Sequence, residues 1–142
     1  MRSHLVPGTI LLASLGIGNP ALAQQHGAAA PNIAKPNMVL QQVVEGLPMD
    51  DKQTVRVMTA TFKPGDKTVY HTHRFPVTVY VLEGAFTLEL EGHPPLTVKA
   101  GEAMVEPPKV PMTGYNRTAT ETRVVIFYVS TNDTPFLDMM SH

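Results

Sequence analysis

The chain of 142 residues contains no cysteine and no tryptophan. Without cysteine it can form no disulfide, no thiolate metal site and no cysteine nucleophile. An excess of either charge is also absent, because 11 basic and 12 acidic residues give a formal net charge of -1. This balance offers no electrostatic basis for binding nucleic acid or an anionic membrane surface. Proline (13) and glycine (10) are plentiful instead, which fits short strands and turns better than helices.

The first 23 residues have the layout of a signal peptide. Arg2 stands near the start, an apolar stretch follows at 10–17, and Ala21-Leu22-Ala23 forms an Ala-x-Ala cleavage site. The apolar stretch is shorter than the roughly 20 residues that a membrane-spanning helix needs. We therefore expect a periplasmic or secreted protein that begins at Gln24 and has no membrane association after cleavage.

Residues 24–37 are small, polar and proline-containing, and they predict a flexible leader. After cleavage, Gln24-Gln25-His26 would stand at the free amino terminus. A histidine in third place can bind Cu(II) together with the terminal amine and backbone nitrogens. Chance placement in a loose leader is the alternative.

From residue 38 onward the sequence alternates between strand-like runs and turn signals. The runs are 38–44, 53–62, 68–73, 77–84, 85–92, 95–102, 103–112 and 121–130. Glu83-Gly84 predicts a hairpin, and prolines within 103–112 confine that run to an edge or a bend. Residues 132–142 are interpreted as a short tail. No helical period is present, so we expect one all-β domain over 38–142, a sandwich or small barrel.

His71 and His73 are the residues most suggestive of chemistry. Side chains at i and i+2 on a strand point to the same face, with Cα atoms roughly 6.6 Å apart. Two imidazoles so placed can converge on one ion, at about 2.0–2.1 Å each. A surface or partly buried pair without an ion is the alternative.

Two spaced patterns resemble the signatures of the cupin superfamily. Gly65, five residues, His71-x-His73 and then Gly84 match the first, and the second is matched at Gly101, Pro107 and Asn116, with Lys109 in place of its second glycine. The "YVLEG" and "EPP" segments are similar to those of small, exported, single-domain cupin type-2 proteins. The resemblance implies a double-stranded β-helix, or jelly roll, that is often a homodimer and holds a metal ion or small-molecule ligand in its barrel.

The resemblance also implies a ligand set that this chain keeps in part. The family usually holds its metal with two histidines, a glutamate and a third histidine. Val77 stands at the glutamate position with no acid expected nearby, and Met112 replaces the third histidine. The metal site is therefore predicted to be degenerate, made of His71, His73 and Met112, unless Met112 merely fills the core. This soft, neutral donor set favours copper as Cu(I), whereas the resemblance implies Mn, Fe or Ni.

These observations leave the function open between two main alternatives. The first is an exported barrel that binds a metal ion, a small molecule or both through His71 and His73. The second is a metal-dependent enzyme of the dioxygenase, isomerase, decarboxylase or lyase type, with substrate completing the metal shell. A barrel with a relic site is a third possibility. The fold alone does not decide, because one fold hosts many activities.

Overall fold

The computed structural model describes residues 33–141. The expected signal peptide and the Gln24-Gln25-His26 motif lie outside the described residues, as does most of the expected leader. Pro36–His142 forms one compact unit. The part of the chain that the structure describes has no helix that could cross a membrane.

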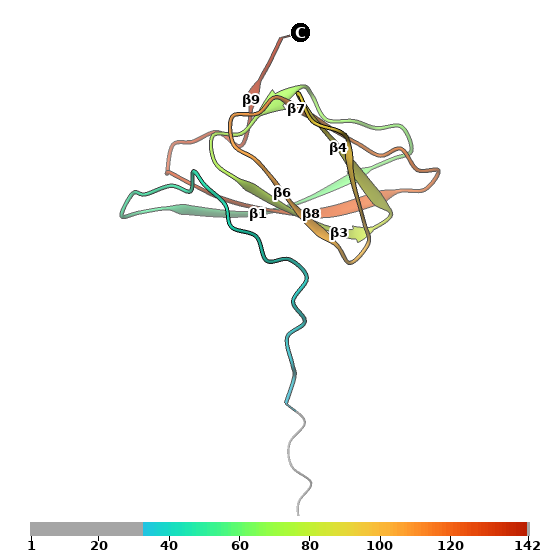
Figure 1. Cartoon of the computed structure of the whole chain (residues 1–142), viewed down its shortest axis with the longest axis horizontal. Coiled ribbons are helices and arrows are strands. Elements are labelled where there is room, and N and C mark those ends of the chain that lie inside the picture. The colour runs from blue at the N-terminus through green and yellow to red at the C-terminus, as the bar shows by residue number, and fades with distance from the viewer. Residues whose placement is uncertain (1–32, 142) are drawn as a thin grey trace, which may run out of the picture. The chain divides into compact units, whose positions relative to one another are not determined.

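Within residues 33–141, nine strands form two antiparallel sheets that face each other (Figure 1). The first sheet has the order β1 (Thr54–Phe62), β8 (Thr122–Ser130), β3 (Val77–Glu83) and β6 (Ala103–Glu106). The second has the order β5 (Leu96–Lys99), β4 (Ala85–Leu90), β7 (Met112–Tyr115), β2 (His71–Thr72) and β9 (Asp138–Met139). This arrangement confirms the all-β, double-stranded β-helix predicted from the sequence.

Alternating side chains place an apolar core between the two sheets. On β3, Val77, Val79 and Val81 are buried, while the residues between them are partly exposed. The buried cluster continues across both sheets with Phe86, Leu88, Val98, Met104, Met112, Val124 and Tyr128. Burying a large aliphatic side chain contributes about 1.5–3 kcal/mol to stability, so this cluster holds the sheets together. The core also supplies the apolar walls of the cavity described below.

Two local expectations are wrong. Residues 38–44 form no strand and are mostly exposed, because no neighbouring strand pairs with them. Glu83-Gly84 is not a hairpin, because β3 and β4 belong to different sheets. Gly84 is the corner at which the chain changes sheet, with φ of +74°. A Cβ there would lie 2.5 Å from Thr122 Oγ1, so the corner requires glycine.

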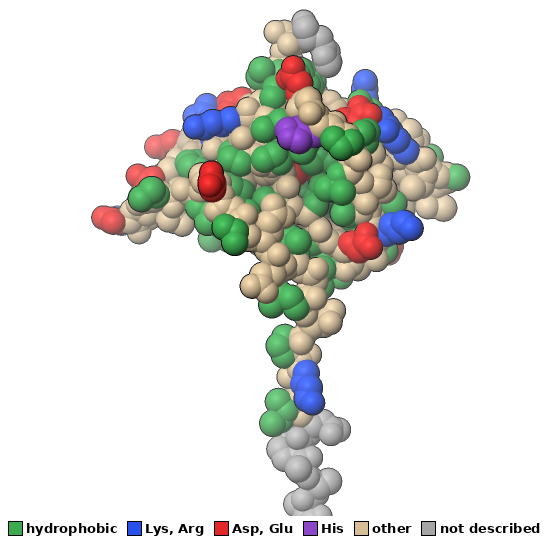
Figure 2. Space-filling view, in the orientation of Figure 1, with side chains coloured by type: hydrophobic (Ala, Val, Ile, Leu, Met, Phe, Trp, Pro, Cys, Tyr) green, Lys and Arg blue, Asp and Glu red, His purple; other side chains and the backbone are tan. Residues whose placement is uncertain are grey.

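The outer surface shows no concentration of charge of one sign on the face seen in Figure 2, where basic and acidic side chains lie among hydrophobic ones. The outward face of the β1-β8-β3-β6 sheet carries several exposed hydrophobic side chains. They include Val55, Val57, Leu82 and Phe127. Val57 lies directly opposite Phe127, and Val55 opposite Val129, so these apolar residues form adjacent rows.

Candidate metal centre

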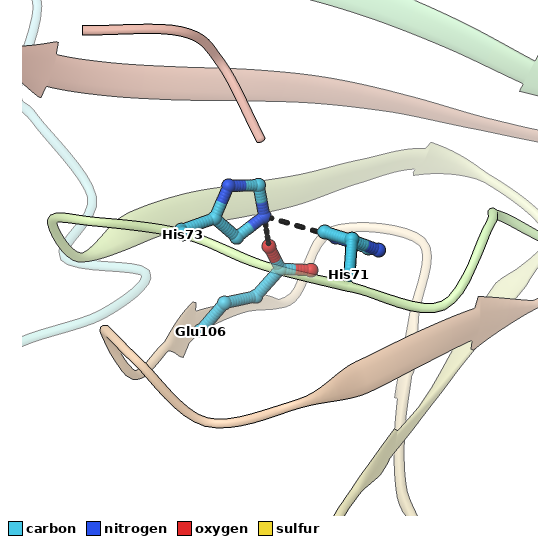
Figure 3. A group of neighbouring side chains, drawn as sticks. All are labelled: His71, His73 and Glu106. Carbon is cyan, nitrogen blue, oxygen red and sulfur yellow. Dashed lines mark hydrogen bonds and ion pairs between the residues drawn. The ribbon is translucent and has the colours of Figure 1, made fainter. Parts of the chain in front are cut away.

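Three buried side chains from two segments of the chain converge at the inner face of the barrel: His71, His73 and Glu106. His71 begins β2, His73 follows its end, and Glu106 is the last residue of β6. His73 Nε2 lies 3.1 Å from His71 Nε2 and 3.1 Å from Glu106 Oε2. Figure 3 shows the three groups turned toward one another. Candidate ligand atoms from all three residues lie within 4.8 Å of one another.

Backbone carbonyls fix the far side of each imidazole ring. His71 Nδ1 donates to the Val69 carbonyl at 2.7 Å, and His73 Nδ1 donates to the Phe136 carbonyl at 2.7 Å. A carbonyl oxygen can only accept, so Nδ1 carries the proton in both rings. In the neutral rings, both Nε2 atoms therefore direct lone pairs toward the same point. Metal-binding histidines are commonly oriented by such hydrogen bonds.

Burial lowers the pKa of the His71 imidazole and so favours its neutral form. The neighbouring His73 lowers this pKa further, whereas the Val69 carbonyl and the Glu106 carboxylate raise it. A buried, neutral imidazole is the form that binds metals. The carboxyl group of Glu106 is also buried, so this corner of the barrel brings an acid and two imidazoles together away from solvent.

Met112 is buried beside the histidine pair in the strand ladder. It lies directly opposite His71 across β2 and β7, so their side chains share the inner face of the sheet. Met112 also belongs to the apolar cluster, where its exposed fraction is 0%. Its position is therefore compatible with both expected roles, a side chain that fills the core and a ligand close to the histidines. Metal binding by His71, His73 and Met112 stays a prediction.

Glu106 is the site residue that the sequence analysis missed. No acid was expected near the position of Val77, yet Glu106 lies directly opposite Val77 across β3 and β6. The expectation failed because it considered only the strand that carries Val77, whereas the carboxylate comes from the neighbouring strand, β6. The signal that could have found it was "EPP", an acid placed immediately before the proline of the second signature.

The signature residues outside this cluster have structural roles. Asn116 is buried, and its amide nitrogen donates to the carbonyls of Phe62 and Thr120. Gly65 and Gly101 both have φ of +85°, the left-handed conformation that glycine tolerates. They lie in turns that join the strands, so they fix the barrel rather than the chemistry.

A small cavity adjoins the three site residues. Its volume is about 50 Å³, and its lining includes Phe62, Phe86, Phe136 and Leu137 together with all three site residues. One water molecule needs about 10–15 Å³ of such volume. The space beside the site therefore accommodates a few waters or a ligand of similar size.

Comparisons with known proteins agree with this architecture. The family model described as "Cupin domain" matches residues 58–128. A cupin-like protein from Thermotoga maritima is 25% identical, with a TM-score of 0.52 over 61% of this chain and 65% of that chain. A double-stranded β-helix protein from Klebsiella pneumoniae is 17% identical, with a TM-score of 0.53 over 71% of this chain and 90% of that chain.

An oxalate oxidase bound to glycolate, a substrate analogue, is 23% identical, with a TM-score of 0.52 over 61% of this chain. This chain spans 46% of that protein and 65% of the Thermotoga protein, and the likeness to the oxidase shows the fold alone. No curated protein matches the sequence. The family match covers half of the chain, and the two-sheet barrel with its inward histidine pair agrees with it. The chain belongs to the cupin domain family.

Proposed function

We propose that this protein binds one divalent transition-metal ion through His71 Nε2, His73 Nε2 and a carboxylate oxygen of Glu106, and presents it to a small molecule inside the barrel. The observation that carries the proposal is the convergence of three electron-pair donors at one buried point. With both Nδ1 protons committed to carbonyls, neutral rings leave no proton between these donors. Lone pairs facing one another away from water repel, so a positive group at their centre would relieve the repulsion.

The spacing of the donors fits an ion. Two ligands bound at about 2.1 Å and at right angles to each other lie about 3.0 Å apart. The separations from His73 Nε2 to its two neighbours are both 3.1 Å. The alternative is a doubly protonated His73 that forms an ion pair with Glu106. That arrangement corresponds to the relic site, which holds no metal.

The donor chemistry favours a divalent ion over Cu(I). Two imidazoles and a carboxylate offset one of the two positive charges, which removes the electrostatic objection to a hard or borderline ion in a dry site. Two histidines and one carboxylate with open positions form the facial triad typical of non-heme iron. With Glu106 as the third ligand the site favours Mn(II) or Fe(II), whereas the ligand set with Met112 favoured copper.

Three protein ligands leave coordination positions free for a small molecule. The cavity of about 50 Å³ beside the site provides the space for it. A bound ion would supply Lewis-acid polarisation of a ligand oxygen. The same open positions would serve the metal-dependent enzyme expected as the alternative, and its reaction type stays open. The signal-peptide layout of residues 1–23 supports a periplasmic or secreted place of action.

Metal analysis tests this function. The mature protein is purified from its native compartment, and its metal content is compared with that of His71→Ala, His73→Ala and Glu106→Gln. His93→Ala and Glu121→Gln are matched controls, because both residues are exposed and outside the site. We expect close to one Mn, Fe or Ni per chain in the parent and the controls, and a metal content at least tenfold lower in each site variant. A metal-free parent that also fails to take up Mn(II) or Fe(II) would show that the site is a relic.

A further inference from the structure

The C-terminal segment, residues 134–140, lies against the candidate metal site and is called here the strap. Its strand β9 pairs with β2, the strand that begins with His71. Two backbone relationships anchor this end of the strap: Met139 lies opposite His71, and the Met140 amide donates to the Tyr70 carbonyl at 3.0 Å. The segment that the sequence predicted to be a simple tail is therefore part of the barrel wall.

Phe136 of the strap contacts His73 in two ways. Its carbonyl accepts the His73 Nδ1 proton, and its ring lies 5.0 Å from the His73 ring, centroid to centroid. The hydrogen bond selects the tautomer whose Nε2 lone pair points at the site. The ring contact restricts rotation of the imidazole. Both contacts depend on the strap, because Phe136 supplies the carbonyl and the ring that His73 contacts.

The strap also forms part of the wall of the cavity. Phe136 and Leu137 line the space of about 50 Å³ beside His71, His73 and Glu106. A volume of about 10–15 Å³ holds one water, so with the strap in this position the cavity has room for roughly three to five non-hydrogen atoms. A ligand as large as a substituted benzene ring would require Phe136 and Leu137 to move.

A salt bridge fastens the strap next to the site. Arg74 Nε and Arg74 Nη2 each donate to an Asp138 carboxylate oxygen, and both hydrogen bonds are 2.9 Å long. Arg74 directly follows His73, and Asp138 lies two residues after Phe136. The side chains remain 54% and 37% exposed, so this bidentate pair is modest in strength and can open. It therefore joins the histidine segment to the strap by a contact that breaks at little cost.

We propose that the strap is a positioning and size-selecting element: while closed it holds His73 in the metal-binding tautomer and admits only ligands of a few non-hydrogen atoms to the ion. This inference rests on the proposed metal site. It assigns Phe136 as a positioning residue, and Arg74 with Asp138 as the latch of the strap.

The latch provides the variants that test the inference. Asp138→Arg places two guanidinium groups together and should loosen the strap, whereas Arg74→Asp combined with Asp138→Arg restores an opposite-charge pair. Glu83→Arg is the matched control, because Glu83 pairs with Arg123 at similar exposure on the other sheet. The charge-swapped protein also carries Asp138→Arg, so its folding shows whether this substitution by itself prevents the chain from folding.

The first readout uses the metal-free protein and does not depend on the metal site. Nitrogen NMR of the imidazole rings distinguishes protonation at Nδ1 from protonation at Nε2. We expect His73 to carry its proton at Nδ1 in the parent, the charge-swapped protein and Glu83→Arg, and to become a mixture of tautomers in Asp138→Arg. Equal spectra for the parent and Asp138→Arg would overturn the positioning role.

The second readout uses Co(II) as a spectroscopic probe of the loaded site. We expect azide, with three atoms, to change the visible spectrum of every variant, and benzoate to change that of Asp138→Arg alone. Release of Co(II) to a chelator should be about fivefold faster in Asp138→Arg, since an exposed ion pair has a small but measurable effect. Benzoate binding to the parent as readily as azide would overturn the size limit. Failure of the parent to bind Co(II) would instead refute the metal site.

Discussion

Glu106 on β6 lies directly opposite Val77 on β3, in an antiparallel pair whose side chains share the inner face of the barrel. Val77 occupies the position at which the resemblance to cupins places a glutamate ligand. Opposite residues in such a pair have Cβ atoms about 4.5–5.5 Å apart. Glu106 therefore supplies a carboxylate beside the position at which the resemblance expects one, but from the neighbouring strand.

This relationship predicts that the carboxylate can be moved back. Glu106→Val should lower the affinity for Mn(II) by tenfold or more, about 1.4 kcal/mol, because it removes the single charged donor. Val77→Glu combined with Glu106→Val should recover much of that loss, because the two positions are direct neighbours across the sheet. Isothermal titration of the metal-free proteins with Mn(II) measures both effects. No recovery in the swapped protein would contradict the equivalence of the two positions.

A carboxylate at the site also changes what is expected of Met112. If Met112 fills the core, Met112→Leu should leave Mn(II) affinity unchanged and cost less than about 1.5 kcal/mol of stability, since the volume is nearly conserved. Anaerobic Cu(I) titration against a chelator tests the copper site expected from the sequence. A large loss of Cu(I) affinity in Met112→Leu, with Cu(I) preferred over Mn(II) in the parent, would favour that earlier soft-metal interpretation.

Lys109 adopts a conformation that suits glycine. Its φ is +63°, and it stands where the resemblance to cupins places a glycine. A left-handed conformation costs a residue with a Cβ atom about 1–2 kcal/mol. Lys109→Gly should therefore raise the free energy of unfolding by about 1 kcal/mol, whereas Lys109→Ala, which keeps the Cβ, should not. Urea unfolding measures both variants, and equal effects of glycine and alanine would contradict the argument.

The homodimer expected from the sequence stays a prediction, and the outward face of the β1-β8-β3-β6 sheet is the surface that fits it. Val57 and Phe127, which lie opposite each other, are 61% and 42% exposed. Exposed apolar patches of this kind commonly mark association surfaces. We expect a dimer by sedimentation velocity and a monomer for Val57→Lys. Val43→Lys is the control, because Val43 is 96% exposed outside that sheet. A monomeric parent would contradict the expectation.

Much of the barrel could be predicted because strand alternation and turn residues are local signals. The run 121–130, for example, corresponds closely to β8. Gly84 shows the limit of such signals, because the same glycine can form a hairpin or a corner between sheets. The choice depends on which strands pair, and here β3 pairs with β6 and β8 rather than with β4.

The histidine pair could be identified from the sequence because His71 and His73 lie only two residues apart. Glu106 and Phe136 could not be found in this way, because they approach His73 from segments 33 and 63 residues further along the chain. Such contacts depend on sheet order and register, which local patterns do not specify. The strap was missed for the same reason, since β9 is two residues long and acquires its partner only in the folded barrel.

Anomalous X-ray diffraction from crystals grown with Mn(II) tests the central claim most directly. The account predicts one strong anomalous peak per chain, bonded to His71 Nε2, His73 Nε2 and a carboxylate oxygen of Glu106. Bond lengths should be close to 2.1 Å, as is usual for imidazole and carboxylate ligands. The absence of a peak among these residues, or an ion bound there without Glu106, would contradict it.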